Sequence, residues 1–291
     1  MIIVKVNGGL GNQMFQYALA RALSRDAKPY LDLSFFDLPP GAHTARPFGL
    51  DIFTLHYERA TTEQLVAFAT ARNSRLKRMW GRSFPAFTKH HFFTERRFSF
   101  DPSVLKVADH TYIEGHWQSE KYFIAVEDRI RRDLCSATEP DMANRAMALR
   151  IQGTRAISVH VRRGDYIHHA AANAVHGTCD ADYYARAMRR MKDQHPDATF
   201  FIFSDDQDWA RAELDPSYAM VFVDLNDSER GYEDMRLMSL CRHHIIANSS
   251  FSWWGAWLNP DPKKLVIAPS RWFLDPAIDT KDLLPAGWIK L

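Results

Sequence analysis

Short apolar runs alternate with helical patterns throughout the second half of this chain of 291 residues. The apolar runs are rich in β-branched and aromatic residues and predict strands, whereas the stretches between them carry apolar residues at helical spacing. Strands with continuous apolar content are buried on both faces, which is typical of parallel sheets. We therefore predict strands at 156–162, 199–204, 219–223, 244–248 and 264–268, and helices at 180–194, 206–214, 231–241 and 251–258.

The first half opens with the same order of elements. An apolar run at 2–6 leads into a glycine-rich turn, a helical pattern at 12–25 and a second apolar run at 28–33, which is how a parallel α/β layer begins. Beyond a Pro-Pro-Gly break at 39–41 the pattern is less regular. There we predict helices at 61–79 and 120–134 and short aromatic runs near 90–93 and 111–117.

These patterns predict an α/β fold made of two facing Rossmann-like domains with a cleft between them. A polar stretch rich in small residues, around 135–155, marks the junction. We place the first domain at 1–145, the second at 155–270, and a tail at 271–291 that packs back on the first domain. In such folds ligands bind beyond the carboxyl ends of the strands.

Charge and cysteine content exclude several classes of protein. Lys and Arg number 37 against 35 Asp and Glu, and a net charge of +2 argues against a nucleic-acid binder. The three cysteines form no CxxC pair, so they indicate a reducing compartment and no metal site. Neither a signal peptide nor a membrane-spanning run is visible, and we predict a cytoplasmic protein. Two histidine pairs without ligand spacing are predicted to be surface or capping residues: His168-His169 and His243-His244.

The first polar segment, NGGLGNQM at residues 7–14, separates a predicted strand from a predicted helix. Its glycines, Gly9 among them, allow a tight turn, and Asn12 and Gln13 stand where amide groups point outward from a helix start. A plain turn with an asparagine cap is one alternative. Dinucleotide binding is another, because Asp32 lies at the distance of a ribose-binding acid, although Met14 occupies the position of the third glycine.

The second segment, HVRRGDY at residues 160–166, begins on the predicted strand 156–162 and leaves it around Arg163 and Gly164. Side chains alternate along a strand, so His160 and Arg162 share one face. A guanidinium fixed at a strand end can neutralise the charge of a departing diphosphate without a metal, and Arg162 is our choice for that role. The alternative for Arg163 and Asp165 is an ion pair that only pins a loop.

The third segment, FSDD, ends at Asp206 after another strand. Adjacent acids on an extended chain diverge, so Asp205 and Asp206 are poorly placed to hold one metal. A single carboxylate can instead accept hydrogen bonds from a guanine edge or from ribose hydroxyls. The alternative is that Asp206 caps the helix that follows.

The fourth segment, NSSFSWWGAW at 248–257, leaves a strand and opens a helix. Hydroxyls of Ser249, Ser250 and Ser252, together with the N–H groups of the helix start, can cradle a phosphate. Ser252 could also be only a cap. The tryptophans at 253, 254 and 257 lie within about one helical turn and are interpreted as core residues, with ligand stacking as the alternative.

Together the four segments GGLGNQ, HVRRGDY, FSDD and NSSFSWWGAWL resemble glycosyltransferase family 11, which contains the bacterial α-1,2-fucosyltransferases. The match runs from residue 7 to residue 257 in the family's order, whereas residues 35–110 show nothing that can be matched. The resemblance implies two Rossmann-like domains in the GT-B arrangement, acceptor-binding first and donor-binding second. It also implies inverting transfer of fucose from GDP-β-L-fucose to the 2-hydroxyl of a terminal galactose, with no cofactor and no metal.

The resemblance further implies roles for individual residues. Arg162 would contact the donor diphosphate, with His160 in the same pocket. Asn12 and Gln13 would face the donor sugar. Further donor contacts would come from Gly9, Arg163, Asp205, Asp206, Asn248, Ser249, Ser250 and Phe251.

The acceptor would be a galactose-terminated glycan, free or lipid-linked, in surface polysaccharide synthesis, with the enzyme in the cytoplasm or at the inner membrane. For the general base Asp165 and His160 are candidates, and a loose transition state could dispense with a strong base. Two other functions stay open at this point. One is an NAD(P)-dependent oxidoreductase that uses the first glycine turn, and the other is a non-catalytic sugar-binding module.

Overall fold

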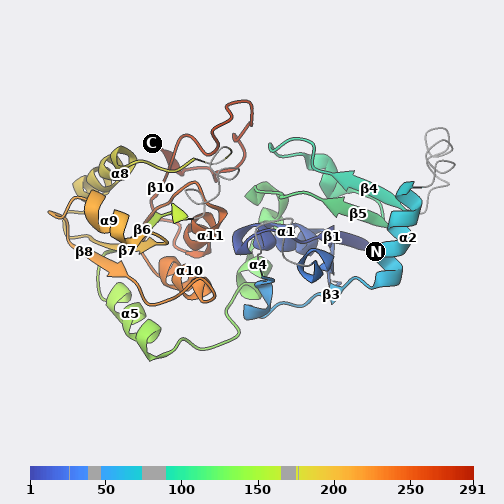
Figure 1. Cartoon of the computed structure of the whole chain (residues 1–291), viewed down its shortest axis with the longest axis horizontal. Helices are drawn as coiled ribbons and strands as arrows, with labels where there is room; N and C mark the ends of the chain where they lie inside the picture. Colours follow the sequence, from blue (N-terminus) through green and yellow to red (C-terminus); the bar gives the residue numbers. More distant parts are fainter. Residues whose placement is uncertain (26, 39–46, 74–89, 165–174, 176) are drawn as a thin grey trace. The chain divides into compact units, whose positions relative to one another are not determined.

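The computed structural model describes residues 1–25, 27–38, 47–73, 90–164, 175 and 177–291. The chain forms two compact units (Figure 1). Unit 1 comprises Met1–Ala137 with Asp279–Leu284, and unit 2 comprises Thr138–Ile278 with Pro285–Leu291. Each unit is built on its own parallel sheet, so the predicted α/β class is confirmed. The break at 39–41 and the end of the predicted helix at 74–79 lie outside the described residues.

Unit 1 contains a five-stranded sheet in the order β3-β2-β1-β5-β4, with parallel pairing throughout. From β1 the chain moves to β2 and β3 on one side, whereas β5 and β4 lie on the other side. The direction of winding therefore reverses between β1 and β5. The strands are β1 (Ile2–Lys5), β2 (Tyr30–Asp32), β3 (Glu58–Arg59), β4 (His91–Thr94) and β5 (Thr111–Glu114), and the α-helices are α1 (Leu10–Leu23), α2 (Thr62–Asn73) and α4 (Glu127–Asp133).

Unit 2 contains a six-stranded parallel sheet in the order β11-β10-β9-β6-β7-β8. Here the winding reverses between β6 and β9. The strands are β6 (Ala156–Val161), β7 (Thr199–Ser204), β8 (Met220–Val223), β9 (His243–Ile245), β10 (Val266–Ala268) and β11 (Ile289–Lys290), and the helices are α5 (Met142–Gln152), α8 (Ala181–Gln194), α9 (Gln207–Glu213), α10 (Gly231–Ser239) and α11 (Ser250–Leu258).

The core of unit 2 consists of two layers on opposite faces of this sheet. All six residues of β6 are buried, as its continuous apolar content predicts. Ile157, Val159 and Val161 pack with α8 and α9 on one face. Ala156 and Phe201 pack with α10 on the other. The tryptophans of α11 are also buried, which confirms them as core residues: Trp253, Trp254 and Trp257.

The structure differs from the sequence prediction in several places. The predicted helix at 120–134 is two 3-10 turns, Glu120–Tyr122 and Ile124–Val126, followed by α4. The polar stretch at 135–155, where no helix was predicted, contains α5, which begins where the Asp141 side chain accepts a hydrogen bond from the Asn144 N–H at 2.8 Å. His243 and His244 are buried rather than surface residues. The Nδ1 and Nε2 atoms of His244 hydrogen-bond with Ser158 and Asn259 at 2.8 and 2.9 Å.

The turn between β1 and α1 depends on a glycine with a positive φ. Gly8 has φ +76°, and a Cβ added there would lie 3.0 Å from the Nδ2 atom of Asn12. Gly9, by contrast, has φ −74° and no atom within 4 Å of an added Cβ. A side chain is therefore strained at the first position and tolerated at the second.

We expect Gly8→Ala to lower the free energy of unfolding by about 1–2 kcal/mol, because L-residues are penalised in the left-handed region. Gly9→Ala is the matched control and should change it by less than about 0.5 kcal/mol. Urea unfolding followed by fluorescence would measure both. Equal losses in the two variants would contradict the assignment of strain to residue 8.

Candidate active site

The carboxyl ends of β6 and β9 flank the point where unit 2 reverses its winding. In open parallel sheets such a reversal leaves a crevice that binds ligands. Arg162 follows the last residue of β6, and Ser249 lies at the start of α11, which follows β9. Two of the predicted segments therefore meet at the place that the topology favours for a ligand.

Asp205 holds Arg162 at this edge. The Nη1 atom of Arg162 lies 2.9 Å from Asp205 Oδ2, and the backbone N–H of Arg163 donates to Asp205 Oδ1 at 2.8 Å. Gly164 permits this approach, since a Cβ there would lie 3.0 Å from Asp205 Oδ2. One carboxylate thus fixes both the backbone after β6 and the guanidinium that we expect to meet a diphosphate.

Arg163 and Asp206 form a second pair beside the first. The Nε atom of Arg163 lies 3.3 Å from Asp206 Oδ2, and its guanidinium lies 4.2 Å from the centre of the Trp209 ring. Asp206 also caps α9 by accepting from the Trp209 N–H at 3.1 Å. Both structural alternatives from the sequence are therefore present, since an ion pair holds the loop after β6 and Asp206 caps α9. The ion-pair partner of Arg163 seen here is Asp206. Asp165 lies outside the described residues.

His160 is a buried neutral imidazole next to these pairs. The residue is 5% exposed, and its Nδ1 atom has no hydrogen-bond partner among the residues that the structure describes. Burial lowers the pKa of His160 to about 4; Asp205 opposes this shift and Arg162 adds to it. The ring lies 5.5 Å from that of Phe251, the second residue of α11. His160 and Phe251 therefore line the same strand ends.

Two serine side chains of the fourth segment, those of Ser249 and Ser252, form hydrogen bonds to nearby backbone groups. Ser249 caps α11 by accepting from the Phe251 N–H at 3.3 Å. Buried Ser252 donates to the carbonyls of Ala247 and Ser249, so it is not available to cradle a phosphate. Ser250 is half-buried as the first residue of α11.

Asn248 anchors the loop in front of α11. This residue is buried, and its Nδ2 atom donates to the carbonyls of Gly177 and Trp272 at 3.3 and 3.2 Å. Its amide therefore holds three segments of unit 2 together. A direct contact between Asn248 and the donor stays a prediction.

The glycine turn of unit 1 is also organised by an amide. Gln13 is fully buried; its Nε2 atom donates to the carbonyls of Gly8 and Pro47, and its Oε1 atom accepts from the Gly49 N–H. The Gln13 side chain therefore holds the turn, and its contact with a donor sugar stays a prediction. Gly9 is the residue that precedes α1, which begins two residues earlier than predicted.

Asp32 contradicts the dinucleotide alternative. Asp32 as a whole residue is 3% exposed; its Oδ2 atom accepts from the Tyr112 hydroxyl at 2.5 Å, and its Oδ1 atom accepts from the Ser34 N–H at 2.9 Å. A ribose-binding acid must present an oxygen at the surface. Asp32 instead joins β2 to β5 within the core of unit 1.

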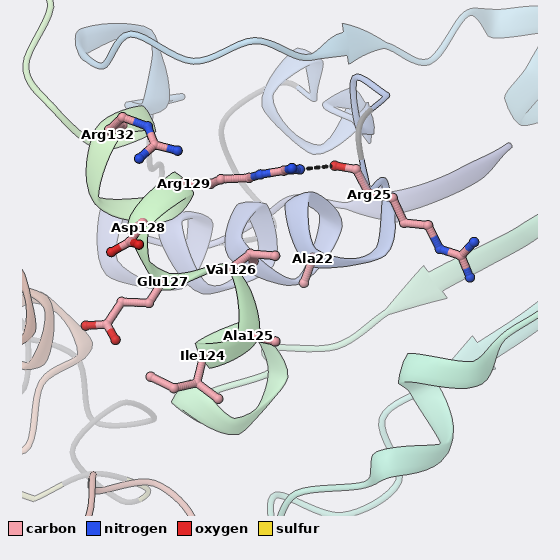
Figure 2. A pocket seen from close by; sticks show the side chains of 9 residues that line it. All are labelled: Ala22, Arg25, Ile124, Ala125, Val126, Glu127, Asp128, Arg129 and Arg132. Atoms are coloured by element: carbon pink, nitrogen blue, oxygen red, sulfur yellow. Dashed lines mark hydrogen bonds between the residues drawn. The ribbon is translucent and has the colours of Figure 1, made fainter.

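A cavity of about 600 Å³ opens elsewhere in unit 1 (Figure 2). Figure 2 shows it between the end of α1, at Ala22, with Arg25 just beyond that helix, and the start of α4, where Arg129 donates to the Arg25 carbonyl at 2.6 Å. Ala22 lies about 20 Å along the helix from Gly9, given a rise of 1.5 Å per residue. The cavity therefore lies at the opposite end of α1 from the glycine turn.

Two groups near the strand ends were missed by sequence reasoning. Asp234 in α10 accepts from Asn226 at 2.7 Å, and burial raises its pKa to about 6. Gln118, which follows β5, donates to Asn12 at 2.8 Å. Asp234 lies within an ordinary helical pattern and Gln118 lies outside the four polar segments, so neither had a local signal.

Among the described residues there is no cluster of three metal-ligating side chains and no helix long and apolar enough to cross a membrane.

The chain was compared with known proteins in sequence and in fold. The sequence model of Glycosyl transferase family 11 matches residues 1–291. The chain is 35% identical to the O-antigen biosynthesis glycosyltransferase WbnK of Escherichia coli, with 98% of this chain and 99% of that protein covered. It is 29% identical to an alpha-1,2-colitosyltransferase of Escherichia coli, with 100% and 99% covered. A solved structure of a mutant of FUT1 from Arabidopsis thaliana, in complex with GDP, shares the fold at a TM-score of 0.51 and 12% identity, with 91% and 69% covered.

The lowered pKa of His160 gives a pH prediction. The folded chain should keep His160 neutral until the pH approaches about 4, whereas an unfolded chain binds the proton near pH 6.5. The stability that His160 contributes is therefore lost as the pH falls from about 6.5 to about 4.

Heteronuclear NMR of ¹³C-labelled histidine should show the neutral form of His160 at pH 5.5, with the signal assigned by its absence in His160→Gln. The free energy of unfolding of that variant should fall less steeply than that of the parent chain over the same pH interval. A His160 signal that titrates near pH 6.5 would contradict the burial argument.

Proposed function

Because the chain belongs to glycosyltransferase family 11, we propose that it transfers L-fucose from GDP-β-L-fucose to the 2-hydroxyl of a terminal galactose, with inversion at the anomeric carbon. The observation that carries this proposal is the fixed guanidinium of Arg162 at the winding reversal of unit 2. A nucleoside diphosphate needs positive charge and N–H donors at such a crevice, and both occur there.

The chemistry of the proposed reaction is a direct displacement. The acceptor oxygen forms a bond to the anomeric carbon while the bond from that carbon to the diphosphate oxygen breaks, and the electron pair leaves with GDP. Negative charge therefore grows on the diphosphate, and positive charge grows on the sugar. Arg162 stabilises the leaving group, and Ser250 with the start of α11 adds neutral donors. In this scheme transfer needs no divalent metal, because the guanidinium supplies the positive charge.

A related donor is a second candidate, since one full-length relative is named for colitose transfer. Another relative is named for O-antigen biosynthesis. We therefore place the reaction in the synthesis of a surface polysaccharide, on a galactose-terminated acceptor that is lipid-linked at the cytoplasmic side of the inner membrane. Assays that offer GDP-fucose and the colitose counterpart in competition would rank the two donors.

For the general base we favour Asp165, which follows the Arg162–Gly164 turn in sequence, over His160. The low pKa of His160 makes it a weak proton acceptor. Asp165→Asn should then lower kcat and remove the acidic limb of the pH–rate profile, whereas His160→Gln should keep the shape of that profile. The reverse pattern would assign the base to His160.

The central test is the removal of Arg162. Arg162→Ala should lower kcat with GDP-fucose by about 10²–10³-fold, the loss seen when an oxyanion donor is deleted. Arg162→Lys should be intermediate, because a lysine keeps the charge but not the forked geometry. Arg189→Ala, an exposed position on α8, is the matched control and should keep full activity.

Ligand binding would be checked in parallel by thermal shift. GDP should raise the Tm of the parent chain and of Arg189→Ala, and raise that of Arg162→Ala much less. Activity should persist in excess EDTA. Near-normal turnover by Arg162→Ala, or loss of transfer with the chelator, would overturn the proposed mechanism.

A further inference from the structure

Unit 1 has a winding reversal of its own, and polar side chains flank it. The reversal lies between β1 and β5, whose carboxyl ends lead into the glycine turn and into residues 115–119. Asn12 comes from the first segment and Gln118 from the second, and the Gln118 Nε2 atom donates to Asn12 Oδ1 at 2.8 Å. This hydrogen bond therefore spans the crevice position of the sheet.

The turn after β5 contains polar atoms that the described residues leave unsatisfied. Gln118 is 8% exposed, and its Oε1 atom has no hydrogen-bond partner among them. The same holds for the Nε1 atom of Trp117, which is fully buried. Leaving a buried donor or acceptor unpaired costs about 1–3 kcal/mol, so such atoms in a native fold call for a partner.

The same turn is held in a strained conformation by a carboxylate. Trp117 adopts φ +60°, which is uncommon for a residue other than glycine. Glu95, which follows β4, accepts from the N–H groups of His116 and Trp117 at 2.7 and 3.2 Å. Gly115 makes room for it, since a Cβ there would lie 2.5 Å from the Cβ of Glu95. Strain of this kind persists where the surrounding structure enforces it, often at ligand sites.

The polar groups at the carboxyl ends of β4 and β5 indicate the kind of ligand that would bind there. Lys5 pairs with Glu114 at 2.6 Å, which leaves Glu95 as an acid without an ion-pair partner among the described residues. Burial raises the pKa of Glu95, whose two backbone donors oppose the shift. This strand end carries a carboxylate that accepts hydrogen bonds, whereas the corresponding edge of unit 2 carries Arg162 and Arg163. Neutral hydroxyl groups, which both donate and accept, suit the carboxylate and the amide oxygen.

We propose that residues 115–119, with Glu95, form the binding subsite for the acceptor sugar, in which Gln118 Oε1 and the Glu95 carboxylate accept hydrogen bonds from hydroxyls of the terminal pyranoside. Asn12 is a positioning residue that orients the amide of Gln118. This inference rests on the proposed function for the identity of the ligand as an acceptor glycan, but the subsite is defined by unit 1 alone.

The test separates acceptor binding from donor binding. Gln118→Met keeps the length of the side chain and removes its polar atoms, and it should raise the KM for N-acetyllactosamine about tenfold or more, the equivalent of about 1.4 kcal/mol. The KM for GDP-fucose should stay within about twofold. Gln118→Glu restores an acceptor oxygen and should recover part of the loss.

Glu95→Gln provides a second variant, and Glu58→Gln is its matched control. Glu58 is an exposed carboxylate at the first residue of β3, at the opposite edge of the same sheet, and its replacement should leave both KM values unchanged. Thermal unfolding of each variant identifies losses that come from misfolding. An unchanged acceptor KM in folded Gln118→Met, or an equal rise in both KM values, would overturn the subsite.

A binding measurement distinguishes failure of this inference from failure of the proposed function. Saturation-transfer NMR should detect N-acetyllactosamine on the parent chain, and the signal should weaken in Gln118→Met. If the parent chain transfers no fucose yet binds the disaccharide through Gln118, the proposed function is wrong and the subsite is kept. If it transfers fucose and Gln118→Met binds the disaccharide as the parent does, the subsite is wrong.

Discussion

The ion pair between Arg162 and Asp205 organises the carboxyl edge of unit 2. It follows directly from strand register, because Val161 of β6 pairs with Ser204 of β7 and the next residue on each strand is one member of the pair. Both side chains are 25% exposed, and pairs in such settings contribute only about 0–1 kcal/mol to stability. Its importance is therefore geometric: a side chain with many rotamers is held at one place before any ligand arrives, which lowers the entropic cost of binding.

Both sheets are parallel and each reverses its winding once, but they differ in what they present at the carboxyl edge. Unit 2 places arginines beside a capped helix start, whereas unit 1 places a carboxylate and amides beside a glycine turn. The difference arises from the few residues that follow each strand. A common scaffold thus supports an edge suited to a charged diphosphate and another suited to a neutral sugar.

The elements that could be predicted from sequence were those with strong local patterns. The strand at 199–204 was placed to the residue, and the four polar segments all lie at strand ends. Partners distant in sequence could not be predicted. Gln13 meets Pro47 and Gly49, and Asn248 meets Trp272, so amides that looked available for a ligand are occupied by the fold. Gln118 was missed for the same reason, because its partner Asn12 lies 106 residues away.

Burial explains why His160 stays neutral, because desolvation penalises the imidazolium; Arg162 adds to this lowering of the pKa, and Asp205 opposes it. A protonated His160 would place a second positive charge next to Arg162, and the repulsion between the two charges would cost free energy. The imidazole avoids this repulsion by remaining deprotonated. Asp205 offsets the charge of Arg162 while no ligand is bound, so the guanidinium is not left without a counter-ion. An arriving diphosphate then meets a guanidinium that is already oriented and an imidazole that adds no charge. The balance of charge at the strand ends therefore changes only with the ligand and with the negative charge that grows on it during transfer.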